Sequence, residues 1–290
     1  MSIAPLGLAA VAGCSLAFAV LDLQRKQLAA TLPALALVVA LMLGGVPFFT
    51  AWLAVTGLPS IGGGYWLPAT GSILLNSVAG FAFLDSVRRA PLSTTIPVLG
   101  LTPVFTAAVG ALLLAELPDG RQVLGIVLVA AGVVWLSLPE RSGPAPEAGR
   151  RRLIGALLML VVALTWSVAG PLDKLAIRES SPAWHGLVLS LGVGFVSLLV
   201  LAAIGRLRDL LALRSRVGLL VAAVLTGTLG MVLQLFALTL VWASFVETLK
   251  RALGSLLALV SGALFFGERV DGRRVAAVLL TVVGVVLIAG

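Results

Sequence analysis

The stretch ELPDGRQV, residues 116–123, returns as ERVDGRRV at residues 268–275. Five of the eight positions are identical, among them the three consecutive residues Asp-Gly-Arg. Each copy separates one apolar run from the next. Aligning 116–135 with 268–287 gives nine identities in 20 positions. Matches of Val and Leu are common in so apolar a chain, whereas a recurring polar triplet is not. The repetition therefore predicts an internal duplication.

A polar stretch separates the two copies. ERSGPAPEAGRRR, residues 140–152, is rich in Pro, Gly and charge and is predicted to be a linker. It leaves residues 1–139 as a first repeat and residues 153–290 as a second. A weaker likeness between LAFAVLDLQRKQLAA and LTWSVAGPLDKLAIRES aligns Lys26 with Lys174.

The repeated hinge has a structural interpretation. Its Glu ends one helix, its Asp is placed to cap the N–H groups of the next, and its Gly permits a tight turn. The alternative is a coupling-ion site at Glu116 or Glu268, since carboxylates near a membrane interior tend to be functional.

The composition identifies a membrane protein. Of the 290 residues, 60% are hydrophobic and only 11% are charged, and the mean hydropathy is +1.15. A soluble domain needs about a quarter of its residues charged, so this surface must face lipid. The net charge of +8 comes from Arg residues scattered between apolar runs, which does not favour nucleic-acid binding. Cys14 is the only cysteine, so no internal disulfide can form, and the first apolar run lacks the basic start of a cleaved signal.

The apolar runs predict the fold class: an all-α polytopic membrane protein with ten transmembrane helices as two inverted five-helix repeats. A helix needs about 20 apolar residues to cross the hydrocarbon core. The runs lie near 4–22, 32–56, 65–87, 91–115, 121–139, 153–172, 184–205, 216–240, 243–267 and 272–289. Because five is an odd number, the second repeat must enter the membrane from the opposite side. Inverted repeats are typical of secondary transporters, whose site lies near the midplane between the repeats.

These features resemble the EamA-type branch of the drug/metabolite transporter superfamily. The resemblance covers PLSTTIPVLGLTPVFTAAVGALLLAELPDGRQVLGIVLVAAGVVWL in the first half and LKRALGSLLALVSGALFFGERVDGRRVAAVLLTVVGVVLIAG in the second. It implies a ten-helix carrier that alternates between inward-open and outward-open states around a central cavity, and it implies little about the substrate.

The ninth run carries three charged residues together, Glu247, Lys250 and Arg251. Spacings of three and four put both cations on the helical face of Glu247. One carboxylate cannot neutralise two cations, so we expect a net positive interior that contacts an anionic substrate group; the alternative is an ion triad that only lets the helix insert. The Lys-Arg pair is similar to one in sugar-phosphate translocators, but those relatives also use a lysine in the fourth helix, and the run 91–115 has no basic residue.

Other polar residues inside the runs are weaker candidates. The additional predicted substrate-binding residues are Thr94, Thr95, Asn76, Gln234 and Trp166, and the predicted gate or coupling residues are Lys26, Lys174, Asp22 and Asp173. For the amides the alternative is hydrogen bonding between helices, and for the charges it is an ordinary position at the end of a helix. His185, the only histidine, is expected at the membrane surface.

The basic residues predict an orientation. Loops one, three, five, seven and nine carry 15 Lys and Arg residues, against three in the even loops and termini. The positive-inside rule places the odd loops in the cytoplasm and both termini outside. Relatives in the superfamily are generally drawn with both termini in the cytoplasm, so the charge count and the resemblance disagree.

The leading functional hypothesis is a secondary transporter or exchanger of a small organic metabolite with an anionic group. The chain has no G-x-x-x-x-G-K-[ST] loop, so an ion gradient or exchange would supply the energy, with Glu247 as the best proton carrier. The alternative on the same fold is a flippase for a lipid or lipid-linked precursor. A membrane-embedded enzyme is disfavoured by one His, one Cys and no clustered carboxylates, and no cofactor or metal is expected. The expected partners are the substrate, the bilayer, and coupling protons or a counter-substrate, in a bacterial inner membrane.

Overall fold

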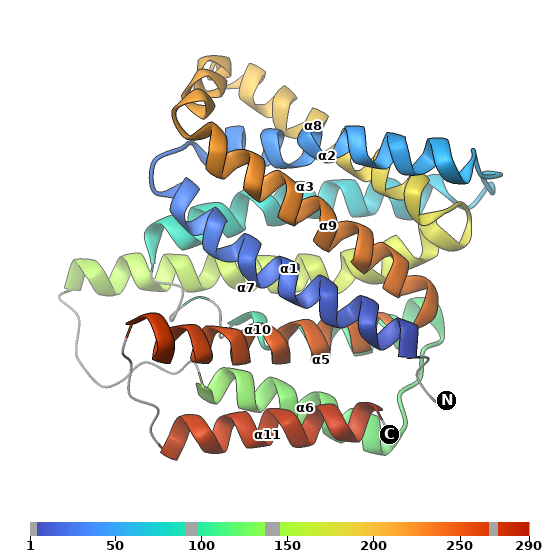
Figure 1. The fold of residues 1–290 in the computed structure, drawn as a ribbon, viewed down its shortest axis with the longest axis vertical. Coiled ribbons are helices and arrows are strands. Elements are labelled where there is room, and N and C mark those ends of the chain that lie inside the picture. Colours follow the sequence, from blue (N-terminus) through green and yellow to red (C-terminus); the bar gives the residue numbers. More distant parts are fainter. Residues whose placement is uncertain (1–4, 91–94, 96–97, 137–145, 267–271, 290) are drawn as a thin grey trace.

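Ten α-helices and one 3-10 helix form the regular structure of the described residues (Figure 1). The computed structural model describes residues 5–90, 95, 98–136, 146–266 and 272–289. The helices are α1 (Pro5–Ala29), α2 (Ala34–Thr56), α3 (Trp66–Arg89), α5 (Thr102–Leu114), α6 (Gly120–Leu136), α7 (Pro146–Arg178), α8 (Pro182–Ala203), η1 (Leu207–Arg216), α9 (Val217–Leu240), α10 (Ala243–Phe266) and α11 (Gly272–Ala289).

Most of these helices suit a bilayer. By length and composition, six of the described helices can cross a membrane, and Thr102–Leu114, Gly120–Trp135 and Val275–Ile288 are apolar but shorter. Large apolar side chains point outward: Leu67 is 86% exposed and Leu112 is 84% exposed. Lipid accommodates such a surface, and water does not. The prediction of a multi-pass, all-helical membrane protein is confirmed.

Two helices are longer than their apolar runs predicted. α1 continues through Asp22 to Ala29, and α7 runs from Pro146, inside the predicted linker 140–152, to Arg178. Glu, Ala and Arg favour helix, so the sequence EAGRRR extends α7 backward after a Pro that fits a first turn. Asp22 and Asp173 therefore lie within helices, and the alternative that they are ordinary charges at helix ends is wrong for these two residues.

The first copy of the hinge caps α6. The N–H of Gln122 donates to Asp119 Oδ1 at 2.8 Å, and the N–H of Asp119 donates back to Gln122 Oε1 at 3.0 Å. This reciprocal pair is a capping box, which satisfies N–H groups that the first turn leaves open. The predicted capping role of the Asp is confirmed for this copy. Residues 267–271 of the second copy lie outside the described residues.

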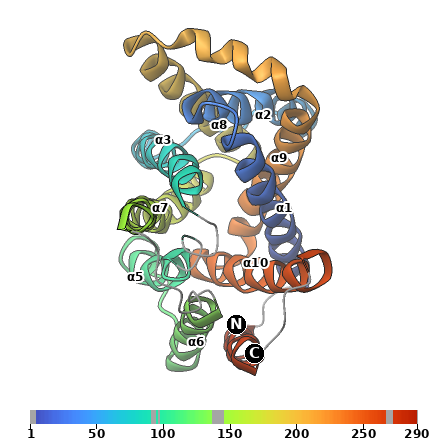
Figure 2. The same ribbon diagram turned by 90° about the vertical axis from the view of Figure 1, so that its left-hand side faces the viewer.

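The contacts that helices of the first half make are repeated by the corresponding helices of the second half (Figure 2). α3 packs on α7 as its counterpart α9 packs on α1, and α5 meets α7 as α10 meets α1. Three helices pack directly on their own counterparts: α2 on α8, α5 on α10 and α6 on α11. Figure 2 shows these pairs along the length of the molecule, with α6 and α11 together at one end. An approximate two-fold relation between the halves accounts for this pattern.

α6 and α11 approach through glycines. A Cβ added to Gly125 would lie 2.6 Å from the carbonyl oxygen of Gly284, and one added to Gly132 would lie 2.8 Å from that of Ala277. Small residues allow such close backbone contact between membrane helices. Gly132 comes after Gly125 in α6, whereas its partner Ala277 comes before Gly284 in α11. The two counterpart helices therefore run antiparallel.

α2 and α8 show the same relation. Gly186 of α8 packs on the ring of Phe49, and Gly194, two turns later, packs on Leu43, which precedes Phe49 in α2. These counterpart helices are also antiparallel. Opposite directions for corresponding helices are what an inverted repeat predicts.

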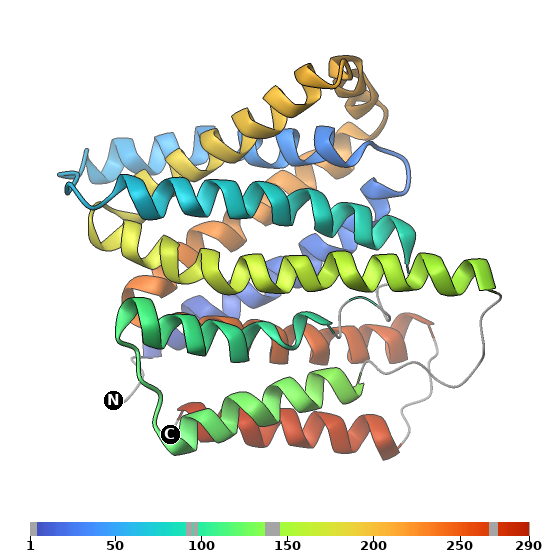
Figure 3. The same ribbon diagram turned by 180° about the vertical axis from the view of Figure 1, so that it is seen from behind.

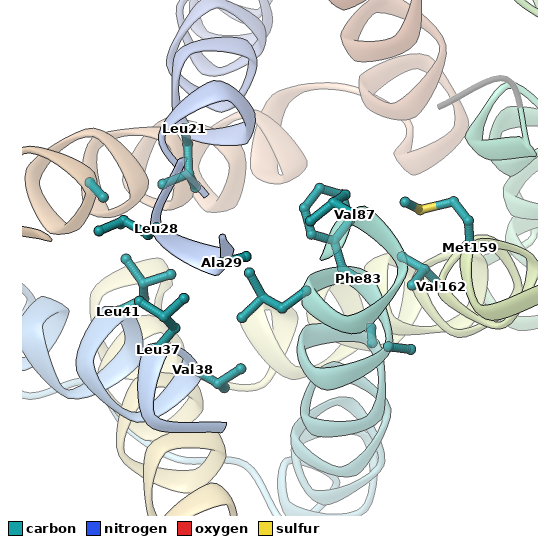
Figure 4. Close-up of a cluster of buried hydrophobic side chains, with 14 of the residues drawn as sticks. Leu21, Leu28, Ala29, Leu37, Val38, Leu41, Phe83, Val87, Met159 and Val162 are labelled. Carbon is teal, nitrogen blue, oxygen red and sulfur yellow. The ribbon is translucent and has the colours of Figure 1, made fainter. Parts of the chain in front are cut away.

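Buried apolar side chains join the helices in two main clusters. Figure 4 shows part of the first, in which Leu28 of α1 lies near Leu37 of α2, and Met159 and Val162 of α7 lie on the side of Phe83 of α3. The second cluster joins α6, α9 and α10 around Val129, Leu235 and Val246. Figure 3 shows α7 extending across the width of the molecule, where it contacts the helices that carry both clusters.

Candidate functional site

A cavity of about 110 Å³ lies among α1, α2, α3, α7, α8, α9 and α10. Apolar side chains form much of its wall, as is usual for ligand sites. Its polar lining residues are Asp22, Arg25, Asn76, Asp173, Gln234, Glu247, Lys250 and Arg251. Helices of both halves supply these groups, so the cavity lies at the boundary between the repeats.

α10 brings the predicted cluster of three charges to this wall. Lys250 Nζ lies 2.5 Å from Glu247 Oε1 and donates a second hydrogen bond, 2.7 Å long, to Gln234 Oε1 of α9. Arg251 reaches the other oxygen of Glu247 at 3.2 Å. As the i, i+3 and i, i+4 spacing predicts, Lys250 and Arg251 share the helical face of Glu247. Gln234 adds a contact from the neighbouring helix.

Each cation of the cavity also lies over an aromatic ring. Lys250 Nζ is 5.1 Å from the ring centroid of Phe18, and the guanidinium of Arg25 is 5.3 Å from that of Phe83. The guanidinium of Arg251 is 5.6 Å from the ring centroid of Trp166. Ring faces attract cations where water is scarce, so they hold these long side chains in place. Trp166 lies at the cavity, as expected from its position inside an apolar run.

The charges of the lining are formally balanced, which corrects the expected net positive interior. Asp22 pairs with Arg25 at 3.3 Å within α1, and Asp173 of α7 faces the same cavity. Among the described residues, three carboxylates and three cations therefore line the cavity. The prediction considered the charges of α10 alone, because the chain order does not reveal that α1 and α7 line the same cavity.

Asp173 is part of a buried hydrogen-bonded chain. Ser72 Oγ of α3 donates to Asp173 Oδ1, and the same oxygen lies 3.0 Å from Nε2 of His185 in α8. His185 Nδ1 is 3.4 Å from the hydroxyl of Tyr65, and Asn76 donates to Ser72 Oγ at 3.0 Å. The prediction that His185 lies at the surface is wrong, since its exposure is 0%. Its position in the first turn of α8 is typical of an interface, but Tyr65, the residue before α3, packs against its ring.

A second group of charges lies outside the central cavity. Lys174 Nζ is 2.5 Å from Glu116 Oε1 and donates to the carbonyl oxygen of Val241 at 2.6 Å. Glu116 Oε2 accepts the N–H of Ala243, the first residue of α10, at 3.0 Å. The pair therefore joins the end of α5, the last turns of α7 and the α9–α10 junction. A pocket of about 540 Å³ adjoins it, with Arg178 among its lining residues.

The remaining predicted residues lie elsewhere. Lys26 is exposed near the end of α1, although the repeat aligns it with the buried Lys174. Thr95 is buried beside Gly155 of α7 and is not part of the cavity lining, so it is not placed to bind a solute there. Thr94 lies outside the described residues.

Sequence reasoning missed Arg25, Phe18 and Phe83. A signal for Arg25 was present, because Asp22 and Arg25 have the same spacing of three as Glu247 and Lys250. The repeat alignment pairs the neighbouring Lys26, and not Arg25, with a charged residue of the second half. The two phenylalanines carry no signal of their own, since any apolar run contains such residues.

Comparison with known proteins adds independent findings. The sequence profile of the EamA-like transporter family matches residues 5–138 and again residues 153–290. A search of curated protein sequences returned no match. A solved crystal structure, described only as that of a protein, aligns with 98% of this chain and 95% of its own, with a TM-score of 0.65 and 20% identity. At that identity the likeness shows the fold alone.

Proposed function

Because this chain belongs to the EamA-like transporter family and is a membrane transporter, we propose that it is a secondary transporter of a small organic metabolite with an anionic group, and that it works by alternating access. The observation that carries this proposal is the charged cavity between the two halves, whose wall contains three carboxylates and three cations. Charges inside a membrane protein are costly to insert and usually mark a substrate or ion pathway.

Ten crossings in two inverted repeats would supply the conformational change. The antiparallel packing of α6 on α11 and of α2 on α8 supports this topology. When two halves are related by an axis in the membrane plane, exchanging their conformations turns an outward-facing cavity into an inward-facing one. The solute would bind near the midplane and be exposed to each side in turn.

Lys250 and Arg251 would bind the anionic group. In the described part of the chain, Arg251 Nε is buried and has no hydrogen-bond partner. A buried donor without a partner costs about 1–3 kcal/mol, which a carboxylate or phosphate oxygen of the solute would remove. Glu247 would hold both cations in place while the site is empty, because it contacts each of them. Asn76 of α3 and Gln234 of α9 would supply further hydrogen bonds.

The pair of Glu116 and Lys174 would close one side. It connects α5, α7 and the start of α10, and both residues are buried. Figure 1 shows that the last turns of α7 and the start of α10 lie on the side where both chain ends lie. The distribution of basic residues would make that side the outer one. Opening the cavity to the outside would then require this ion pair to separate.

A ligand screen followed by counterflow tests the proposal. Purified protein in detergent would be heated with carboxylate- and phosphate-bearing metabolites and with their neutral amide or alcohol analogues. A ligand at 100 times its Kd stabilises the folded state by about 2.7 kcal/mol. We expect stabilisation by anionic members only, and exchange of the same radiolabelled solute in liposomes.

Two variants and a control refine the result. Lys250→Gln and Arg251→Gln should each reduce counterflow at least tenfold, whereas Arg208→Gln, on the exposed 3-10 helix η1, should leave it unchanged. Normal counterflow in both cavity variants would refute the anion-binding role. Scrambling of a fluorescent phospholipid by the wild-type protein, without solute exchange, would favour the flippase alternative.

A further inference from the structure

Asp173 differs from Glu247, Asp22 and Glu116 in the kind of cation that it contacts. Glu247 contacts two cations, Asp22 contacts Arg25 and Glu116 contacts Lys174. In the described part of the chain, the ion-pair partner of Asp173 is His185 alone. A lysine or arginine keeps its charge at neutral pH, whereas an imidazole gains or loses a proton between about pH 5 and 8.

We propose that the Asp173–His185 pair binds and releases the coupling proton of this transporter. The inference rests on the proposed transport function and assigns an ion site to it. In the empty form, neutral His185 donates its Nε2–H to Asp173 Oδ1. When a proton arrives, it forms a second N–H bond at Nδ1, and the imidazolium remains paired with the carboxylate. No other bond forms or breaks.

Tyr65 allows both forms. Its hydroxyl lies 3.4 Å from His185 Nδ1. A hydroxyl can donate to the bare nitrogen of the neutral ring and can accept the N–H of the imidazolium. Burial, together with the nearby charge of Asp173, raises the pKa of Tyr65 above its ordinary value, so the phenol keeps its own proton. Proton binding therefore leaves no buried group without a partner.

The location of the Asp173–His185 pair favours a role in proton coupling over a purely structural role. Asp173 lines the central cavity, so its charge acts on whatever occupies it. The other charged groups that share this cavity are Asp22 and Arg25 of α1 and Glu247, Lys250 and Arg251 of α10. A proton on His185 offsets the negative charge of Asp173, which leaves the three cations of the lining in excess and strengthens the binding of an anionic solute.

α7 links this site to the ion pair that closes one side. Lys174 follows Asp173 directly in the chain. Its amine pairs with Glu116, outside the cavity. Pro171 lies two residues earlier within the helix, where it removes a backbone hydrogen bond and permits bending. A bend there moves Asp173 and Lys174 together, so proton binding and separation of the Lys174–Glu116 pair are mechanically connected.

Glu247, the carrier expected from sequence, fits this role less well. Protonating it would leave Lys250 and Arg251 without the carboxylate that each contacts, in a buried setting. Protonating the Asp173–His185 pair produces instead an imidazolium that faces a carboxylate.

His185 can report on its own protonation, because it is the only histidine in the chain. Untagged protein labelled at histidine ¹³Cε1 would be placed in lipid nanodiscs and titrated by NMR. The buffer would be taken from about pH 8 to about pH 5, and we expect one signal that moves reversibly. Asp173→Asn, which lacks the negative charge beside the ring, should give a different response, and Asp85→Asn, whose carboxylate pairs with Arg89 at the end of α3, should respond like the wild-type protein. A signal that stays at one position across this range, or a response unchanged by Asp173→Asn, overturns the proposal.

Transport then separates the coupling from the function itself. Liposomes would contain pyranine and the carboxylate or phosphate solute found in the counterflow screen. His185→Gln should lose at least tenfold of the accumulation driven by a pH gradient, whereas Asp85→Asn, at the partly exposed pair with Arg89, should accumulate the solute like the wild-type protein. Unchanged accumulation in His185→Gln overturns the coupling while the transport function stands. Absence of all counterflow in the wild-type protein refutes the transport proposal, and the NMR titration still decides whether His185 binds a proton.

Discussion

Removing one partner of the Glu116–Lys174 pair is expected to destabilise the protein strongly. The charged atoms lie 2.5 Å apart, and the relative exposures of the two residues are 5% and 8%. At an effective dielectric constant of about 20, the attraction is about 7 kcal/mol before desolvation is subtracted. Breaking a buried pair from one side usually costs about 3–5 kcal/mol, because the remaining charge has no partner.

Lys174→Met should therefore lower the free energy of unfolding by about 3–5 kcal/mol. Glu116→Gln should cost a similar amount, although its amide oxygen still accepts the N–H of Ala243. The double variant removes both charges, so no buried charge remains without a partner. We therefore expect it to be no less stable than either single variant. The coupling energy of the cycle would then be at least about 3 kcal/mol.

Unfolding in mixed detergent micelles, followed by circular dichroism, measures these differences. Asp85→Asn is the matched control, since its pair with Arg89 is partly exposed and should contribute less than about 1 kcal/mol. Strictly additive losses in the double variant would refute the reasoning, as would single losses no larger than that of the control.

Two further predictions concern helix packing and capping. Gly125→Ala should cost about 1–3 kcal/mol, because its methyl group would overlap the carbonyl oxygen of Gly284. In the same unfolding assay, Gly218→Ala, with no atom near the new methyl group, should instead stabilise α9 by about 0.5–1 kcal/mol; equal effects of the two would contradict the close packing of α6 and α11. Asp119→Ala should cost about 0.5–2 kcal/mol by removing the cap of α6, and an unchanged midpoint of unfolding would show that the cap contributes nothing.

Short-range features of the site followed from spacing alone. Glu247, Lys250 and Arg251 share a face because residues three and four apart in a helix are neighbours, whatever surrounds them. The cap at Asp119 is equally local. His185 and Arg25 were misjudged or missed, since their roles depend on which other helix lies beside them.

The apolar runs, the duplicated hinge and the shortage of charge were enough to establish a helical membrane protein built from a repeated half. Helix formation and membrane insertion depend on hydrophobicity and hydrogen bonds within each segment, and these can be read along the chain. The balance of charge in the cavity, the buried chain from Asp173 to Tyr65 and the partner of Glu116 were decided by packing between helices. Lipid-facing and protein-facing sides are about equally apolar in such a chain, so hydrophobicity does not tell which helices become neighbours.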